Sequence, residues 1–576
     1  MTEEEKVKHI TTRLGDLEKL RQPWESTLFQ PVIDYIDPHR MSMQIDNITP
    51  QKIGTYIYDG TPQSALQIAT DGYYGNLVSP KLNWIKMNLP ISVKGKMAFR
   101  GNQQLKKLNI PDGRLDKLPE IKMWLEDCTD VMYSAYRKSN FYSEIREWFN
   151  DYLAFGTPCI YIEEDVKNQR IVFSVRHPGE VYFDKDFFGN INTIYRKIKL
   201  TARDCANEFG ESNLPDNIKK AYENNRSDLF DFLHCVEPRV YYDTSKVNAK
   251  NKPWADIYLC LSGSTRDKKI IQEGGHNSNP YTVGRTVKRI PNTPYCYSVC
   301  MEALVTAITL NQVGKDMLNL SHVHSQPPWW IPMEMKETFD NRPNAQNYYD
   351  DPTRIPFQQN IKGKYPIGID QITRLQDTLE DLLMVKLFLM FARIDKPMTA
   401  TEALQLAGEK ATNLSPQIFG MENGLDRMSD AVFEIELNAG RMPPLPPILY
   451  EFLGERIDFE FMGPLSQLQK RLVATQSISS AIETIAPILS IEPNTRFVVK
   501  WEDTVRELLE TNGMPTRNIN TKEEYAAIMG QMQQQAAVQQ AMQGIDVAGK
   551  AVQRGSREVD PGSPVAKIME AMGGEG

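Results

Sequence analysis

Two long segments in the second half of the chain repeat apolar residues at helical spacing. The first runs roughly from Tyr295 to His324 and is apolar around most of its circumference. The second runs from Asp370 to about Ala392; its first half is amphipathic, and its end is apolar on all sides from Leu387. A helix with so wide an apolar surface needs cover on more than one side, from its own chain or from copies of it. An ordinary helical hairpin in one core is the simpler explanation at this point.

The connection between these helices, Pro327 to Ile369, is rich in proline and poor in helix signals. A connection of this length inside a compact domain usually has a function. The pair Trp329-Trp330 near its start has two interpretations. It anchors the base of the loop by hydrophobic contacts, or it contacts a partner, since tryptophan is favoured at interface hot spots.

After the second helix, the segment Arg393–Met398 is a predicted break, because the residue before Pro397 is driven out of the helical region. Thr399 followed by Glu402 has the pattern of a capping box and starts a further helix. That helix is expected to reach about Ala439.

The first half of the chain changes from one period to another. Helical spacing predicts helices over residues 5–45, from Tyr56 to Val78, and from Lys122 to Phe155, where an aromatic stripe is typical of core packing. Alternating apolar residues then predict an antiparallel meander from Ile160 to Leu200 and a second β region from Cys235 to Tyr242, Ile257 to Ser262 and Lys269 to Gln272. This part is therefore expected to be mixed α+β.

Composition limits the class of protein. A chain of 576 residues, 41% hydrophobic and 24% charged, is typical of a globular protein with several domains. Seven scattered cysteines without CxxC spacing favour free thiols in a reducing compartment. The chain begins without an apolar signal core, and no apolar stretch reaches the roughly 20 residues that span a bilayer, so we expect no membrane partner and a protein that stays where it is made. The formal net charge of −8 argues against a simple nucleic-acid binder.

The sequence lacks the motifs of common enzymes. Gly314-Lys315 has Thr309 where the first glycine of a phosphate-binding loop should stand, and Asp316 where Ser or Thr should follow. The neighbouring His322 and His324 have neither a cysteine pair nor an HExxH helix beside them, and the sequence has no GxSxG elbow. We therefore expect no catalytic residue, no metal and no cofactor.

The run Tyr295–Pro328, with the pair Leu310-Asn311 and the exit Gln326-Pro327-Pro328, resembles the first stem helix of portal (head-to-tail connector) proteins of short-tailed, double-stranded-DNA bacteriophages. Other short motifs of that family follow in the same order over about residues 10 to 540. They are Arg21-Gln22-Pro23-Trp24-Glu25, Tyr58-Asp59-Gly60-Thr61-Pro62, Leu77-Val78-Ser79-Pro80 with Trp84, Met398-Thr399-Ala400-Thr401-Glu402, Arg441-Met442-Pro443-Pro444, Gly463-Pro464-Leu465 and Asn512-Gly513-Met514-Pro515. Each motif is short, but their joint order is specific.

The resemblance implies an α+β portal fold of wing, stem, clip and crown that assembles into a ring with a central channel. It assigns the wing to residues 1–290, the first stem helix to 291–324, the clip to 325–369, the second stem helix to 370–392, the tunnel loop to 393–398, a long wing helix to 399–450, the crown to 451–543 and a disordered tail to 544–576.

The resemblance also implies roles for particular residues. The tunnel loop would bring Arg393, Asp395 and Lys396 to the channel, with the two cations facing phosphates; a surface turn with solvated charges is the alternative. The expected partner contacts of the clip are Trp329, Trp330, Lys336, Arg342, Arg354, Lys362 and Lys364. The expected packing residues between neighbouring stems are Leu304, Ile308, Met317, Leu375, Leu379 and Leu382.

The implied function is a structural ring, of twelve copies by resemblance, at one vertex of the capsid, through which the genome is packaged and ejected. The implied partners are other copies of the chain, the major capsid and scaffolding proteins, the large terminase subunit, the tail adaptor or nozzle proteins and the duplex DNA, with assembly in the host cytoplasm before incorporation into the virion. An acidic channel wall would repel phosphates and let DNA slide. The alternatives are a non-conducting oligomeric scaffold or adaptor of the virion and, third, an enzyme such as a nuclease.

Overall fold

The computed structural model describes residues 2–40, 43, 57–81, 83–90, 118–243, 246, 248–262, 269–340, 345–348, 351–358, 365–389, 400–447, 449, 457–463, 505, 509, 520 and 524–535, with the backbone alone at 365–367 and 400–415. The chain divides into two compact units. The first comprises Met1–Asp116 and Trp124–Pro487, and the second comprises Lys117–Met123 and Ile488–Gly576. The described part of the first unit is mixed helix and sheet, which confirms the predicted α+β class.

The predicted N-terminal helix is present, but it ends at Tyr35 and does not continue to residue 45. It consists of α1 (Glu3–Trp24), a π-helical turn (Glu25–Phe29) and α2 (Gln30–Tyr35). Thr2 and Glu5 form a capping box at its start. The apolar face of α1 packs on one sheet, with Ile10, Leu14 and Leu17 in a buried cluster that also includes Tyr195, Leu233 and Ile257.

Three further helices precede the sheets, namely α4 (Thr61–Leu77), α7 (Pro119–Lys138) and α8 (Phe141–Phe155). The single helix predicted from Lys122 to Phe155 is therefore wrong. The chain breaks at Ser139-Asn140, where the Ser139 hydroxyl accepts a hydrogen bond from the Phe141 amide at 3.1 Å and competes with the helical pattern. The predicted core role of the aromatic stripe is confirmed, since Trp148, Phe149 and Tyr152 are buried.

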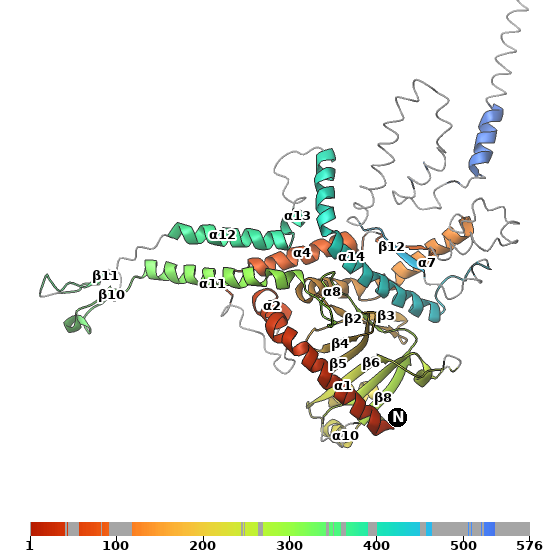
Figure 1. Cartoon of the computed structure of the whole chain (residues 1–576), viewed down its shortest axis with the longest axis horizontal. Coiled ribbons are helices and arrows are strands. Elements are labelled where there is room, and N and C mark those ends of the chain that lie inside the picture. The colour runs from red at the N-terminus through yellow and green to blue at the C-terminus, as the bar shows by residue number, and fades with distance from the viewer. Residues whose placement is uncertain are drawn as a thin grey trace, which may run out of the picture. The chain divides into compact units, whose positions relative to one another are not determined.

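The predicted meander is divided between two antiparallel sheets (Figure 1). The three-stranded sheet has the order β3-β2-β9, from β3 (Arg170–Arg176), β2 (Cys159–Asp165) and β9 (Tyr281–Val283). The five-stranded sheet has the order β4-β5-β6-β7-β8, and its strands are β4 (Val181–Lys185), β5 (Ile191–Thr201), β6 (Leu229–Pro238), β7 (Trp254–Cys260) and β8 (Lys269–His276). Alternation in a sequence does not identify a strand's neighbours, and β9 takes the edge beside β2.

Two short helices that the sequence analysis did not include, α9 (Ala202–Phe209) and α10 (Asp216–Glu223), cover part of the five-stranded sheet. Their buried residues Cys205, Phe209 and Ile218 share a cluster with Phe232 and Cys260. The seven cysteines are free and buried, as the scattered spacing predicted.

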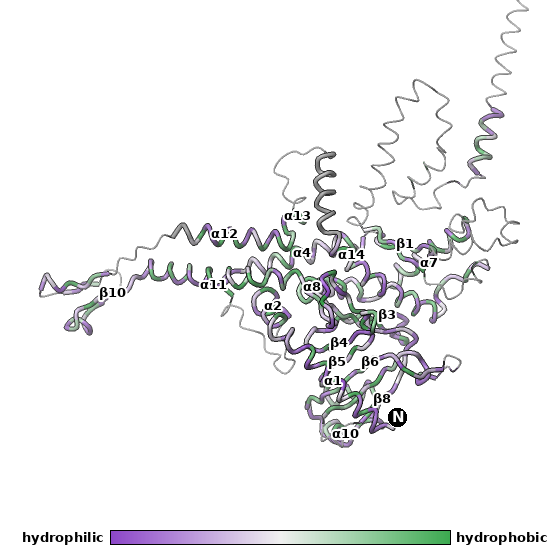
Figure 2. The backbone as a smooth tube through the Cα atoms, viewed as in Figure 1, coloured by the Kyte–Doolittle hydropathy of each residue, from purple (hydrophilic) through white to green (hydrophobic). Residues whose placement is uncertain are grey.

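The two long helices form a hairpin, in which α11 (Val299–Ser325) and α12 (Tyr365–Leu382) lie side by side (Figure 1). The first helix begins at Val299 and not at Tyr295, because the Ser298 hydroxyl caps it by accepting a hydrogen bond from the Met301 amide at 3.1 Å. The second begins at Tyr365 and not at Asp370. Figure 2 shows that hydrophobic and hydrophilic residues alternate along both helices.

The second helix does not run unbroken to Ala392. It stops at Leu382, Met384 takes a left-handed φ of 56°, and α13 (Val385–Leu389) follows. The long helix predicted after the break is present as α14 (Ala400–Asn438), which ends close to the expected Ala439.

The region assigned to the crown, 451–543, does not belong to one unit. Its strand β12 (Asp458–Phe461) pairs with β1 (Ile85–Asn88) in the first unit, and Trp84 stacks on Phe461. In the second unit, residues 524–535 are helical. The tail at 544–576 lies outside the described residues, as do Thr399 of the capping box and the tunnel-loop residues Arg393, Asp395 and Lys396. No helix in the described part of the chain is long and apolar enough to span a membrane.

Candidate functional site: the α11–α12 hairpin

The α11 helix has one covered face and one open face. Met301, Leu304 and Leu310 are buried, because α12, α2 and α8 pack against this side of the helix. On the open side Val305 is 74% exposed, and Ile308 and Val323 are exposed as well. The helix therefore carries more apolar surface than one chain covers.

The two helices approach closely near the far end of the hairpin. A Cβ atom built on Gly368 of α12 would lie 2.2 Å from the Met317 sulfur of α11. That distance is shorter than any real contact, so the glycine permits the close approach. Nearer the body of the unit, Leu379 of α12 is fully buried.

Two motifs that are far apart in the sequence meet on the hairpin. The Asn311 side-chain oxygen on α11 accepts a hydrogen bond from the Tyr58 amide at 2.7 Å. Asp59 accepts one from the Thr61 amide at the start of α4, at 2.8 Å, and one from the Gln376 side chain on α12, at 2.9 Å. The segment before α4 thereby connects both hairpin helices, which gives the Asn311 and Asp59 motifs a structural role.

The start of α11 is fixed to the body of the unit by aromatic and polar contacts. Trp24 packs on Tyr295 and Tyr297, with ring centroids 5.8 and 5.5 Å apart. The buried guanidinium of Arg21 donates to the Gly179 and Val181 carbonyls at 2.8 and 3.1 Å. The motif Arg21–Glu25 therefore anchors α1 between the five-stranded sheet and the root of α11.

The break in the second helix is held by charge and packing. The Lys386 amine lies 3.1 Å from the carboxylates of both Asp377 and Asp381, so it bridges from α13 back to α12. Phe388 packs edge-on against Tyr73 of α4, with ring centroids 5.1 Å apart. These contacts fix the direction in which the chain leaves the hairpin toward the segment 390–399.

The tip of the hairpin is a short β ladder between β10 (Trp329–Trp330) and β11 (Phe357–Gln358). Trp329 is half-buried against Phe339, with ring centroids 5.2 Å apart. Trp330 is 57% exposed and stacks on the exposed Phe357. The two interpretations of the tryptophan pair thus apply to different residues, since Trp329 anchors the loop and Trp330 is open to solvent.

The remaining residues expected at the tip fall into two groups. Lys336 is exposed, and Arg354 forms an exposed ion pair with Glu334 at 2.9 Å. Arg342, Lys362 and Lys364 lie outside the described residues.

The six residues expected between neighbouring stems differ in exposure. Leu304 and Leu379 are buried within the chain, Met317, Leu375 and Leu382 are half-buried, and Ile308 is exposed. Proposed contacts between copies therefore rest on Ile308 and not on the two buried leucines. Sequence reasoning passed over Val305 and Val323 as contact residues; both are β-branched apolar residues 18 positions apart, which places them on one face of the helix.

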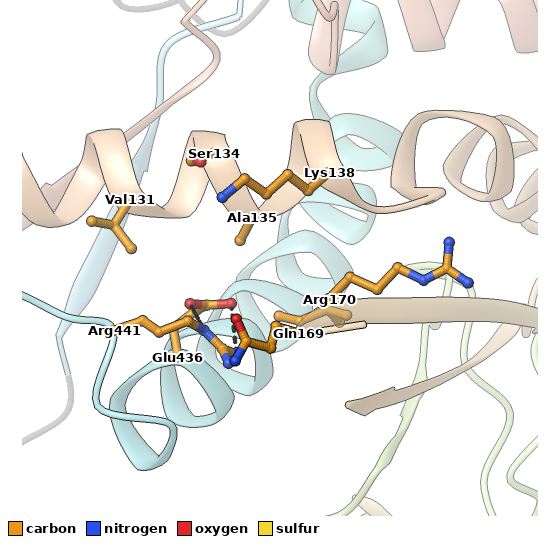
Figure 3. Close-up of a pocket in the computed structure, with 9 residues that line it drawn as sticks. Val131, Ser134, Ala135, Lys138, Gln169, Arg170, Glu436 and Arg441 are labelled. Atoms are coloured by element: carbon orange, nitrogen blue, oxygen red, sulfur yellow. Dashed lines mark hydrogen bonds and ion pairs between the residues drawn. The ribbon is translucent and has the colours of Figure 1, made fainter. Parts of the chain in front are cut away.

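A separate hollow of about 200 Å³ lies between α7, the β2–β3 turn and the end of α14 (Figure 3). Lys138, Gln169, Glu436 and Arg441 are among its lining residues. Arg441 donates to both Glu436 oxygens, at 2.7 and 3.1 Å, and to Glu164 at 2.9 Å. The carboxylate in the lining is therefore ion paired, and Arg441, the first residue of its motif, ties α14 to β2.

A series of hydrogen bonds joins polar side chains of β6, β7, β8 and β9. Asp256 accepts hydrogen bonds from Nε2 of His234 at 2.7 Å and Nε2 of His276 at 2.9 Å, and Nδ1 of His234 accepts from the Tyr281 hydroxyl at 2.8 Å. Burial lowers the pKa of His234, although Asp256 opposes the shift. Burial alone would raise the pKa of Asp256, but the two histidine hydrogen bonds lower it below its usual value. His234 and Tyr281 are buried, whereas Asp256 and His276 are half-buried. Tyr281 belongs to β9, so these hydrogen bonds connect the five-stranded sheet to the three-stranded sheet. No described group of histidine, cysteine, aspartate or glutamate has the arrangement of a metal site.

The described part of the chain thus combines a long helical hairpin that has exposed apolar side chains with an ordered tip and two antiparallel sheets. Residues 7–519 match the family model described as bacteriophage head to tail connecting protein, and the chain belongs to this family of phage structural proteins. The chain is similar to the "Probable portal protein" of Bordetella phage BPP-1, with 26% identity over 96% of both chains. It is also similar to the "Portal protein" of Salmonella phage epsilon15, with 25% identity over 97% of this chain and 96% of the relative.

Proposed function

We propose that copies of this chain assemble into a dodecameric ring at one vertex of a phage capsid, and that double-stranded DNA passes through the ring during packaging and ejection. The names of the two relatives support a portal role, and family membership supports a position between head and tail. The single observation that carries the proposal is the exposure of three apolar side chains on the open side of α11, those of Val305, Ile308 and Val323.

An exposed apolar face on a long helix favours contact with another protein surface. Its partner in the proposed ring is the hairpin of the next copy. Such a contact uses two different surfaces of the same chain, and heterologous contacts of this kind close into rings when the rotation allows it. The buried face of α11 is already covered by α12, α2 and α8, so only the open face is left for a neighbour.

The exposed face of α12 has a different character and suits the channel. Asp370, Arg374, Asp377 and Asp381 are exposed there, and Lys386 is paired with two of these carboxylates. A surface of mixed charge, whose cations are already ion paired, makes few lasting contacts with phosphates. Many lasting contacts would hold the DNA in place. The charged face of α12 therefore favours sliding.

The tip supplies a surface for docking proteins. Trp330, Met333 and Phe357 are exposed around the β10–β11 ladder. Aromatic residues and methionine are enriched at protein interfaces. In the proposed function this surface receives the large terminase subunit during packaging and the tail adaptor afterwards, while other parts of the chain contact the capsid and scaffolding proteins.

The ring is tested by placing charge on the open face of α11. The double variant Val305→Asp, Ile308→Asp should fold as a monomer, because both side chains are solvent-exposed, and should fail to form rings because buried carboxylates would face the neighbour. The matched control is Val166→Asp, since Val166 is equally exposed but lies in the β2–β3 turn.

Negative-stain microscopy and native mass spectrometry measure the outcome. Rings with a central hole in the wild type and in Val166→Asp, but only monomers in the double variant, support the proposal. Rings of unchanged abundance in the double variant would contradict it. Closed rings without a hole wide enough for a duplex would favour the non-conducting adaptor instead.

A further inference from the structure

The turn between β4 and β5 presents two consecutive phenylalanines to solvent. Phe187 is 98% exposed and Phe188 is 85% exposed, and their rings contact each other edge-on with centroids 5.6 Å apart. Phenylalanine is normally among the buried residues of a folded chain. A pair of nearly fully exposed phenylalanines on a short turn therefore calls for an explanation beyond the packing of this chain.

The turn that carries these residues is rigid. The Asp186 amide donates to the Asn190 carbonyl at 2.8 Å, and the Asn190 amide donates to the Asp186 carboxylate at 2.7 Å. Gly189 takes the left-handed φ of 85° that the turn requires, and Arg285 donates to its carbonyl at 2.5 Å. An aromatic pair on a fixed backbone loses little conformational entropy when it binds, which is the usual property of an interface anchor.

A second exposed aromatic group lies at the same end of the five-stranded sheet. In the antiparallel order β4-β5-β6, the end of β4, the start of β5 and the end of β6 lie together, so the segment after β6 is near the Phe187–Phe188 turn. That segment contains Val240, Tyr241 and Tyr242, which are all exposed. Aromatic side chains present about 150–250 Å² each, so the four exposed rings offer roughly 650 Å². The largest apolar patch of a typical monomer is about 300–600 Å², so the area of these rings is at or above the upper end of that range. A standard interface buries about 800 Å² on each partner, so the rings would supply most of one side.

A series of contacts links the turn to the open face of α11. Arg285, which binds Gly189, is followed by the exposed Val287, and the Lys288 amine is ion paired with Glu302 on the first turn of α11. The Thr286 hydroxyl donates to the carbonyl of the exposed Tyr297 at 2.7 Å, and Val305 follows one turn after Glu302. The series of contacts between the turn and α11 thus includes two exposed apolar residues, Val287 and Tyr297, between the phenylalanine pair and Val305.

We infer that the Phe187–Phe188 turn is an anchor between copies of this chain, and that its occupant is the surface of a neighbouring copy. The inference rests on the proposed ring, whose contact it extends from α11 to the end of the five-stranded sheet. A second copy is favoured over another kind of protein because these contacts connect the turn to the side of α11 that the neighbour would cover in the proposed ring. A contact that extends from α11 to the end of the five-stranded sheet would fix the angle between neighbouring copies. This angle decides whether successive heterologous contacts close into a ring.

The test removes the aromatic pair without disturbing the fold. The double variant Phe187→Ser, Phe188→Ser should keep the circular dichroism spectrum and thermal midpoint of the wild-type monomer, because neither ring packs inside the chain. Its association, measured by native mass spectrometry over a dilution series, should need a protein concentration about 30-fold higher or more, as expected for a hot-spot residue. The matched control is Val166→Ser, which removes an exposed apolar side chain from the β2–β3 turn and should associate like the wild type.

The outcomes separate this inference from the proposed function. If the wild type forms rings and the serine double variant forms them at the same concentration and with the same subunit number, the ring stands and the anchor is refuted. If the wild type never forms rings, the proposed function fails and the anchor fails with it.

The occupant is identified by photo-crosslinking in the purified wild-type background. A benzoylphenylalanine placed at position 187 should give covalent dimers within rings and none in dilute monomer, with the crosslinked peptide mapping to a second copy. Crosslinks only within the same chain, or none in fully formed rings, would overturn the assignment.

Discussion

At the scale of single residues, the polar side chains with the most specific contacts connect segments that are far apart in the chain. Asp59 links the start of α4 to Gln376 of α12, and Asn311 binds the Tyr58 backbone. Arg21 and Arg441 do the same for α1 and α14, each with at least three acceptors. Four of the short motifs that suggested the family thus contain a residue that connects helices to other segments.

Acid should weaken the five-stranded sheet through His234. Its pKa is lowered by burial, so the native chain resists a proton that the unfolded chain accepts near pH 6.5. The neutral histidine therefore makes its full contribution to the free energy of unfolding above pH 6.5. This contribution is lost as the pH falls below 6.5. Burial also lowers the pKa of His177, so this histidine likewise lowers the stability of the fold in acid. The pKa of Asp256 is lowered by its histidine partners, so its contribution is lost only at lower pH, below about 4.

The expected result is a thermal midpoint that falls between pH 7.5 and 5.5 in the wild type and falls less steeply in His234→Gln. The variant should start lower at pH 7.5, because glutamine replaces the Asp256 and Tyr281 hydrogen bonds imperfectly, at a cost of roughly 1–3 kcal/mol. Replacing the exposed His9 by glutamine is the control and should leave the slope unchanged. Parallel curves for wild type and His234→Gln would show that this histidine does not titrate as inferred.

At the scale of elements, the hairpin depends on close helix contact at one glycine. Gly368 faces the Met317 sulfur with no room for a Cβ atom, and Leu379 is buried nearer the body of the unit. The break at Met384 then redirects the chain, held by Lys386 and Phe388. The contact at Gly368, the buried Leu379 and the bend at Met384 thus each contribute to the shape of the helical hairpin.

Replacing Gly368 by valine should separate the helices locally and destabilise the hairpin by about 1–3 kcal/mol, the usual cost of overpacking. Hydrogen exchange should rise in peptides from both α11 and α12 around Met317 and Gly368. The matched control is Gly314→Ala on α11, where the new Cβ would lie an ordinary 3.5 Å from Tyr58 and alanine favours the helix by roughly 0.5–1 kcal/mol. Unchanged exchange in Gly368→Val would mean that Met317 moves aside without cost.

At the scale of the whole molecule, the proposed ring separates two functions along one hairpin. In the proposed ring, contacts between copies would involve the exposed side chains of α11, and contacts with docking proteins would involve the tip with Trp330 and Phe357. The two sets lie on different elements, so variants should affect them independently.

The double variant Trp330→Ala, Phe357→Ala should form rings as the wild type does, because both side chains are exposed and lie outside the proposed stem contact. In a complementation assay it should give few complete virions, since truncation of aromatic hot spots typically costs 2 kcal/mol or more of binding, about 30-fold in affinity. Sedimentation of heads and electron microscopy distinguish empty heads, which indicate failed packaging, from filled heads without tails. Normal yields of complete particles would remove the tip from the proposed docking site.

Much of the fold followed from local patterns. The N-terminal helix, the hairpin helices, α14 and the core aromatic stripe were all predicted, because apolar periodicity and capping act over a few residues. Local patterns did not predict three features of the fold: β2 pairs with β9, β1 pairs with β12, and the chain bends at Met384. Pairing depends on contacts between residues up to hundreds of positions apart, and nothing in the local pattern of β12 identifies β1 as its neighbour.

The sequence by itself determined that two long apolar helices flank a proline-rich tip, and the order of its short motifs indicated the phage connector family. Only the tertiary structure decided which of the apolar residues are buried inside the chain and which stay exposed to solvent. Leu304 and Val305 are adjacent and both apolar, yet one is buried and the other is 74% exposed. The reason is that periodicity gives the faces of a helix, whereas exposure depends on which other helices pack against each face, and that is fixed by the fold as a whole.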